Sequence, residues 1–435
     1  MASSSLGPAM GVAAVVMVAY SLVALRVNEA SSIPYMDEIF HVPQAQKYCA
    51  GRYSDWDPKI TTFPGVYIAG VALAHLTKLV GWTTDASFCS MDVLRFVNVL
   101  FAAATAWLAV RLRATLAPTD KHAALHALMV ISFPVLVFFA FLFYTDAGAT
   151  FFVLLTYWLA TRVDLRVRPM GIASFLPSAL VGQFAWPFPR IVGAAAVLFR
   201  QTNIVWVVFV AGVLVVRFVE VSRGHHIYGF SKQDAKLHPS SLVVRNSTAR
   251  VLANFVVAVL SDLPALLRIL WPFVAVVATF LAFLVHNGGI VVGDKSNHEA
   301  GFHGAQVLYF IFVASTGFGA SLLAPSQISR FADAVRRQAK SLSGLLFLLV
   351  ALSSVLLVIH WFSPVHKFML ADNRHYTPRY YLIPFVLLHL HTPPQPAWQL
   401  ASTIVAFTLV NVVTLYVFMY RPYTWGDGST ARFMW

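Results

Sequence analysis

Apolar stretches that are long enough to cross a membrane recur along almost the whole sequence, as at 9–26, 92–110 and 399–419. A helix needs roughly 17–25 such residues to cross a hydrocarbon core of about 30 Å. Only 11% of the residues are charged, whereas a soluble globular chain would have about a quarter. These features predict an all-α polytopic transmembrane helical bundle that forms one domain over 1–435.

We expect about eleven spans, with short loops rich in Lys and Arg on the cytoplasmic side. They are 9–26, 92–110, 122–142, 147–161, 170–199, 204–219, 264–286, 304–324, 343–362, 380–391 and 399–419. The first run has no early basic cluster and no clear cleavage site, so we interpret it as a retained span and not as a signal peptide. The span 170–199 is interrupted by Trp186-Pro-Phe-Pro-Arg190 and is expected to be broken there.

One further apolar stretch, 64–81, is expected to lie at the membrane surface. Counting it as a span would place the basic groups that follow 110 on the same side as Asp37. Under this topology 27–91 is a large first loop on the non-cytoplasmic side, and 220–250 is a polar cytoplasmic loop. The net charge of +13 then reflects topology and attraction to lipid headgroups, so membrane lipids are expected partners and nucleic acid is not.

The stretch 34–62 concentrates acids, histidine, aromatic residues and amides in a chain that has little charge elsewhere. Asp37 and Glu38 follow the first span, so they are expected to face water at the membrane surface. The alternative is an acidic loop that only ends the first helix. Such a loop would need neither His41 nor the aromatic residues between 48 and 56, so we interpret 34–62 as the active site.

Under the expected topology, five polar clusters fall on one membrane face. They span 37–62, 144–146, 200–203, 293–306 and 366–376. Ionisable groups left against lipid would cost several kcal/mol each, so such a gathering indicates a site. The acids lie in the first loop, and the later clusters carry the basic and imidazole groups Arg200, Lys295, His298, His303, Arg374 and His375. This distribution is typical of a general base that faces an anionic leaving group.

Other interpretations have weaker support. His298 and His303 could bind zinc, but no nearby acid and histidine complete a ligand triad. No Gly-rich phosphate loop and no Gly-x-Ser-x-Gly motif is present. A lipid or solute transporter would carry its ionisable groups inside the spans, which here are nearly free of charge. Each late cluster taken alone could also simply anchor helix ends.

Eight motifs in order along the chain resemble one known family. They are Pro34-Tyr-Met-Asp-Glu-Ile-Phe-His-Val-Pro-Gln-Ala-Gln46, Trp56-Asp-Pro-Lys-Ile-Thr-Thr62, Leu94-Arg-Phe-Val-Asn98, Tyr144-Thr-Asp146, Arg200-Gln-Thr-Asn203, Gly293-Asp-Lys-Ser-Asn-His298, Leu370-Ala-Asp-Asn-Arg-His-Tyr376 and Arg432-Phe-Met-Trp435. The sequence resembles the dolichyl-phosphate-glucose dependent alpha-1,2-glucosyltransferases of the endoplasmic reticulum. It departs from them near 172–190, which is longer than the family pattern, and in the polar loop 220–250.

The resemblance implies a GT-C fold whose luminal loops form the site, with dolichyl-phosphate-glucose as donor and a dolichyl-diphosphate oligosaccharide as acceptor. It implies no nucleotide sugar and no obligatory metal or other cofactor. Asp37 is our first candidate for the base, and Glu38 the second. We expect Arg374, Lys295, Arg200 and His375 to bind the donor phosphate. Residues expected to orient substrates are His41, Gln44, Trp56, Asp57, Asp146, His298 and Asp372. A lipid or solute transporter is the alternative function.

Two further features remain open at the level of sequence. Cys49 and Cys89 both fall in the first loop, where an oxidising compartment would permit one disulfide, and simple burial is the alternative. Asn246-Ser-Thr248 is a formal glycosylation sequon in the loop that we expect to be cytoplasmic, so it should be unmodified.

Overall fold

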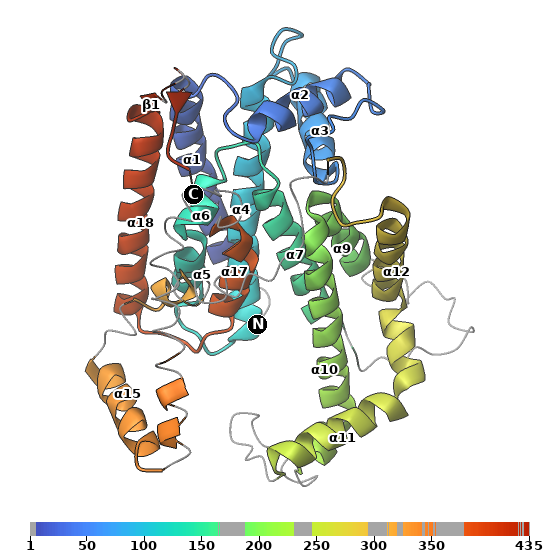
Figure 1. Ribbon diagram of the computed structural model, residues 1–435, viewed down its shortest axis with the longest axis vertical. Helices are drawn as coiled ribbons and strands as arrows, with labels where there is room; N and C mark the ends of the chain where they lie inside the picture. The colour runs from blue at the N-terminus through green and yellow to red at the C-terminus, as the bar shows by residue number, and fades with distance from the viewer. Residues whose placement is uncertain are drawn as a thin grey trace. The chain divides into compact units, whose positions relative to one another are not determined.

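The chain is mostly helical in the computed structural model (Figure 1). The structure describes residues 6–163, 165, 188–229, 246–294, 311, 313–319, 325–341, 344–346, 348–350, 353, 378–424, 426, 428 and 430–434. Within these ranges five helices are long and apolar enough to cross a membrane: Leu6–Ala30, Met91–Leu116, Gln201–Gly224, Leu263–Asn287 and Ala397–Tyr420. They confirm the expected helices at 9–26, 92–110, 204–219, 264–286 and 399–419. The protein is therefore a multi-pass membrane protein.

The contacts divide the chain into two compact units. Unit 1 contains 1–55, 70–147 and 296–435. Its helices are α1 (Leu6–Ala30), α2 (Glu38–Cys49), α4 (Met91–Leu116), α5 (Ala123–Ile131), α6 (Pro134–Phe138), α15 (Pro325–Gln338), η5 (Pro378–Tyr381), α17 (Leu382–Leu390) and α18 (Ala397–Tyr420). After α18, the short strands β1 (Tyr423–Thr424) and β2 (Thr430–Ala431) pair in antiparallel fashion. Helices α3 (Gly65–Leu79) and α7 (Asp146–Thr161) each have residues in both units.

Helix α4 is the centre of unit 1. Two-thirds of its apolar window is buried, against at most one-third in the other four candidate spans. Within the unit, α1 and α5 pack against α4, and α18 packs against α5 and α6 (Figure 1). The segment 133–144, which follows α5, is buried almost throughout. Its phenylalanines meet those of later helices: Phe133 stacks on Phe385 of α17, and Phe138 contacts Phe418 of α18 edge to face.

Unit 2 contains 56–69 and 148–295. Its elements are α9 (Phe188–Phe199), η2 (Gln201–Asn203), α10 (Ile204–Tyr228), α11 (Thr248–Ser261) and α12 (Leu263–Asn287). Ser247 is the N-cap that precedes α11, and its hydroxyl accepts a hydrogen bond from the Arg250 amide. The apolar face of α11 packs against Val219 and Ile227 of α10.

Several expected spans differ from the observed helices. The stretch 122–142 is not one helix, because α5 ends at Ile131 and α6 begins at Pro134. Proline has no N–H to donate and disfavours helical geometry in the residue before it, which explains the break. Helix α10 continues to Tyr228 and so occupies the beginning of the expected loop 220–250. The stretch 170–199 is described only from 188 onward, and most of 304–324 and 343–362 lies outside the described residues.

Two expectations about 27–91 can be compared with the structure. Helix α3 has 15 residues and is too short to count among the candidate spans. This agrees with our expectation that 64–81 does not cross the membrane. The position of α3 at a membrane surface stays a prediction. Cys49 and Cys89 form a disulfide, which ties the end of α2 to the loop before α4. Of the two alternatives left open by the sequence, the structure therefore has the bonded one.

Candidate active site

The carboxylate of Asp37 is accessible at the start of α2. Its backbone is already helical and its side chain makes no capping bond. Instead, Oδ2 accepts a hydrogen bond of 3.0 Å from the Arg379 guanidinium, and the side chain remains 43% exposed. The Asp37 amide donates to the Tyr144 hydroxyl at 2.9 Å. Asp37 is thus an oriented acid that a proton donor can reach.

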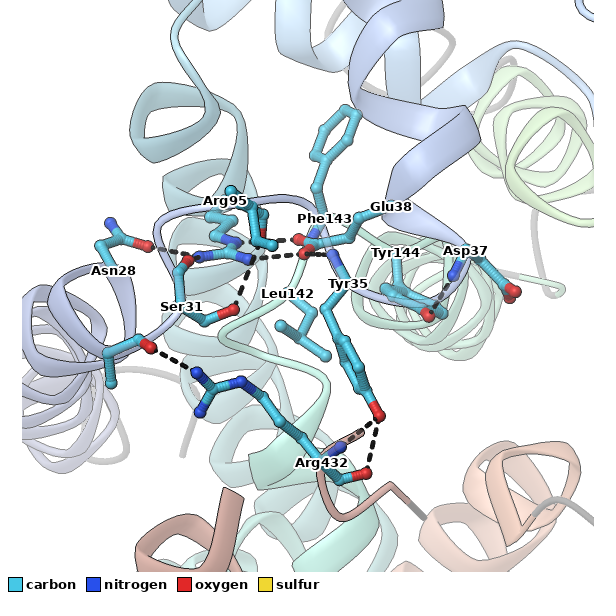
Figure 2. A network of polar contacts seen from close by, with 12 residues as sticks. Asn28, Ser31, Tyr35, Asp37, Glu38, Arg95, Leu142, Phe143, Tyr144 and Arg432 are labelled. Atoms are coloured by element: carbon cyan, nitrogen blue, oxygen red, sulfur yellow. Dashed lines mark hydrogen bonds and ion pairs between the residues drawn. The ribbon is translucent and has the colours of Figure 1, made fainter. Parts of the chain in front are cut away.

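The neighbouring acid, Glu38, has a different environment (Figure 2). Its side chain is fully buried and accepts hydrogen bonds from Arg95 on both oxygens, at 2.9 and 2.6 Å. The amides of Tyr35 and Phe143 donate to the same carboxylate at 3.1 and 2.6 Å. Arg95 also donates to Asn28 and Ser31. Glu38 therefore connects α4 to the backbone at Tyr35 and at Phe143. Both of its carboxylate oxygens are occupied by hydrogen-bond donors.

His41 and Tyr144 lie beside Asp37. Their rings meet edge to face with centroids 5.9 Å apart. Burial lowers the pKa of His41, although the nearby carboxylate of Asp37 opposes this shift. Burial likewise raises the pKa of the Tyr144 hydroxyl. Both shifts favour the neutral form of the side chain. Asp146 begins α7 and is buried beside them, and its negative charge also acts on His41.

The segment 142–144 is held in place by α4. Asn98 donates from its side-chain amide to the carbonyls of Leu142 and Tyr144, at 2.6 and 2.8 Å. Gln44 plays a similar part in α2, since its buried amide donates to the carbonyl of Asp55 at 2.6 Å. These amides support the backbone around the site.

Unit 2 brings together three other polar motifs. The carbonyl of Thr61 accepts from the Gln201 side chain at 2.7 Å and from the Val292 amide at 3.2 Å. The carbonyl of Pro58 accepts from the Asp294 amide at 2.8 Å, and Lys59 pairs with the Asp294 carboxylate at 3.2 Å. The stretches 56–62, 200–203 and 293–294, expected to converge, therefore meet within this unit.

Three expected site residues lie in the same part of unit 2. Trp56 contacts the Tyr67 ring edge to face, and its indole N–H points to the Ile60 carbonyl at 3.4 Å. Asp57 accepts from the Lys59 amide at 2.9 Å and so shapes the turn. Arg200 is half-buried and directly precedes η2.

The remaining expected site residues, Lys295, His298, Asp372, Arg374 and His375, lie outside the described residues. Among the residues that the structure does describe, no group of three or more His, Cys, Asp or Glu side chains could hold a metal ion.

Sequence reasoning missed three arginines: Arg95, Arg379 and Arg432. Arg95 belongs to the motif 94–98, which is one of those that resemble the family, and it lies inside the expected span 92–110. A charged residue inside a membrane span generally indicates a function. Arg379 directly precedes the expected span 380–391, where a basic residue is common at the end of a membrane helix and does not indicate a site. Arg432 belongs to the terminal motif, and its position in the sequence gives no hint of its contacts.

The chain is similar to known proteins over most of its length. Residues 31–378 match the model of the DIE2/ALG10 family. A Mus musculus relative named Dol-P-Glc:Glc(2)Man(9)GlcNAc(2)-PP-Dol alpha-1,2-glucosyltransferase is 34% identical over 92% of this chain and 93% of its own. A Homo sapiens relative of the same name is 32% identical with the same coverage, and one from Arabidopsis thaliana is 29% identical over 95% and 97%. No solved structure matches significantly.

The match covers the turn that carries Asp37, the helix that carries Arg95 and the chain as far as the start of η5. Both the extent of this match and the identity to the mouse relative show that the chain belongs to the DIE2/ALG10 family.

Proposed function

We propose that this protein is an inverting glucosyltransferase that moves glucose from dolichyl-phosphate-glucose to the 2-hydroxyl of a diglucosylated dolichyl-diphosphate oligosaccharide. The names of its relatives state this donor, acceptor and linkage. The observation in this chain that carries the proposal is the accessible Asp37 carboxylate, oriented by Arg379 beside the buried His41 and Tyr144. We place the enzyme in the endoplasmic reticulum membrane, as a GT-C bundle of about eleven spans with a luminal site.

A single carboxylate can perform this reaction. Asp37 accepts the proton of the acceptor 2-hydroxyl while that oxygen attacks the anomeric carbon of glucose from the side opposite the phosphate. The bond from that carbon to the phosphate oxygen breaks, its electron pair leaves with dolichyl phosphate, and the configuration inverts from beta to alpha. Inverting glycosidases use a second carboxyl group to protonate the leaving oxygen. A phosphate is already a weak base and needs no such acid.

We assign Glu38 to positioning and not to proton transfer. Four hydrogen bonds occupy its carboxylate, and it is completely buried. Asp37 lies one residue away and is accessible, so the two candidates from the sequence are separated by their surroundings.

Negative charge develops on the departing phosphate, and fixed cations stabilise it. Our candidates for this role remain Arg374, Lys295, Arg200 and His375. Arg379 lies 3.0 Å from Asp37, so we assign it to orienting the base. We propose His41, Gln44, Trp56, Asp57, Asp146, His298 and Asp372 as residues that orient the substrates or support the site.

The test is glucose transfer by the purified full-length protein in liposomes. Dolichyl-phosphate-glucose labelled in the sugar is supplied with acceptors that carry zero, one, two or three glucoses. We expect transfer to the acceptor with two glucoses only, with an alpha-1,2 linkage in the product. Movement of labelled donor across the bilayer without any transfer would reject this function in favour of the transporter.

A further inference from the structure

We propose that Tyr35 and the C-terminal Arg432 form a clamp that positions the base, Asp37. This clamp comprises the hydroxyl of Tyr35 and the main chain of Arg432, which Figure 2 shows. It also includes the guanidinium of Arg432 and the ends of α1 and α18 that this group contacts. The inference rests on the proposed function, because it assigns positioning residues to that same site.

The turn before Asp37 has a conformation that needs support. Met36 has φ +54°, in the left-handed region that residues other than glycine rarely adopt. Its side chain is 48% exposed, so burial of this side chain does not explain the conformation. Such conformations persist where the surroundings constrain the backbone, and they cluster at functional sites. The constraint on Met36 must come from its neighbours.

Both neighbours of Met36 are fixed by hydrogen bonds. On one side, the Tyr35 hydroxyl accepts from the Arg432 amide and donates to the Arg432 carbonyl, each at 2.7 Å. The Tyr35 amide donates to the Glu38 carboxylate, and its ring packs edge to face on Phe418. On the other side, the Asp37 amide donates to the Tyr144 hydroxyl.

Arg432 is itself anchored to the ends of two helices. Its guanidinium donates to the carbonyl of Ala30, the last residue of α1, at 2.7 Å. It also donates to the carbonyls of Phe418 and Met419 in the last turn of α18, at 2.7 and 3.0 Å. Carbonyls at helix C-termini lack partners within the helix and favour a cation. The planar fork of arginine can serve both helix ends at once.

The direction of the Asp37 carboxylate follows from this arrangement. The backbone of 35–37 sets where α2 begins and therefore where its first side chains point. A displacement of about 1 Å in a reacting group can reduce the rate roughly 100-fold. Tyr35 and Arg432 contact no reacting atom in this proposal, so they are positioning residues.

The test compares Tyr35→Phe with the double variant Tyr35→Phe/Met36→Gly in the full-length enzyme. The first change removes both hydrogen bonds to Arg432 and keeps the ring on Phe418. We expect kcat to fall about tenfold, with each KM changed by less than about twofold. Glycine adopts positive φ without steric cost, so the double variant should recover most of kcat. A merely structural role of the Tyr35 hydroxyl would lower the melting temperature, whereas a positioning role lowers kcat in protein that remains folded at the assay temperature.

Tyr416→Phe is the matched control, because it removes the hydroxyl of an exposed tyrosine of α18 and should leave kcat unchanged. A wild-type kcat in Tyr35→Phe would overturn the proposal, and so would an equal loss in the double variant.

Amide hydrogen exchange at 35–37 supplies a readout that does not depend on activity. Exchange should be faster in Tyr35→Phe than in the wild type, and unchanged exchange would also overturn the clamp. If the wild-type protein transfers no glucose, the proposed function fails while this measurement still decides the clamp.

Discussion

Exchanging each of the two adjacent acids for its amide should separate catalysis from stability. Both carboxylate oxygens of Glu38 accept hydrogen bonds, and the donors are Arg95 and the amides of Tyr35 and Phe143. In Glu38→Gln, an NH2 group replaces one of these two oxygens. The buried guanidinium then loses its counter-charge, and an N–H is forced against other N–H groups. In Asp37→Asn, the partly exposed contact with Arg379 is altered and the negative charge near His41 is lost.

We expect Glu38→Gln to lower the stability of the protein, and Asp37→Asn to lower its turnover. Breaking a buried ion pair by removing one partner costs about 3–5 kcal/mol, and we expect a fall in melting temperature on the order of 10 °C for Glu38→Gln. A half-exposed pair such as Asp37 with Arg379 contributes only about 0–1 kcal/mol, so Asp37→Asn should melt close to the wild type. Turnover by Asp37→Asn should fall about 10²–10⁴-fold, because this variant lacks a well-placed base.

Two measurements on the same preparations decide the matter. Intrinsic tryptophan fluorescence during heating in detergent reports unfolding, and glucose transfer well below the melting temperature reports kcat. If Asp37→Asn keeps near-normal turnover, Asp37 is not the base. If Glu38→Gln melts like the wild type, our account of the buried pair is wrong.

Further outcomes follow from other parts of the structure. Replacing both Cys49 and Cys89 by serine should cost about 4 kcal/mol through the loop that the bond closes, seen as a lower melting temperature, and mass analysis without reductant should find no free thiol in the wild type. Gly293→Ala should disrupt the turn at that position, because φ is +78° and a Cβ would collide with a backbone carbonyl, so limited proteolysis should cleave there faster. Asn246 should carry no glycan in the native host, and a mass shift of its peptide on amidase treatment would contradict the cytoplasmic placement. Because burial lowers the pKa of His41, the unfolded chain binds this proton first, so stability should fall as the pH drops below about 6.5, and less so in His41→Gln.

The pattern of residues along the chain was sufficient to predict the five long apolar helices found among the described residues, and the stretch that holds the acids. These are local properties: a long apolar run becomes a helix in lipid wherever it lies, and an acidic stretch after such a run lies near the membrane surface. The same reasoning failed at 122–142, where a single proline divides an apolar run into α5 and α6. No change in composition marks the division into two units either.

The roles of Asp37 and Glu38 depend on the tertiary structure, because adjacent acids look alike in a sequence. Successive helical residues point about 100° apart, so at the start of α2 one carboxylate is exposed beside Arg379 and the next is buried against Arg95. The partners that distinguish them are remote. Arg379 lies 342 positions from Asp37, and Arg432 lies 397 positions from the tyrosine that it holds. Sequence alone predicted that an acid acts in this turn, and only the packing of distant segments around α2 distinguishes the surroundings of the two acids, since burial and hydrogen bonding are properties of the folded chain.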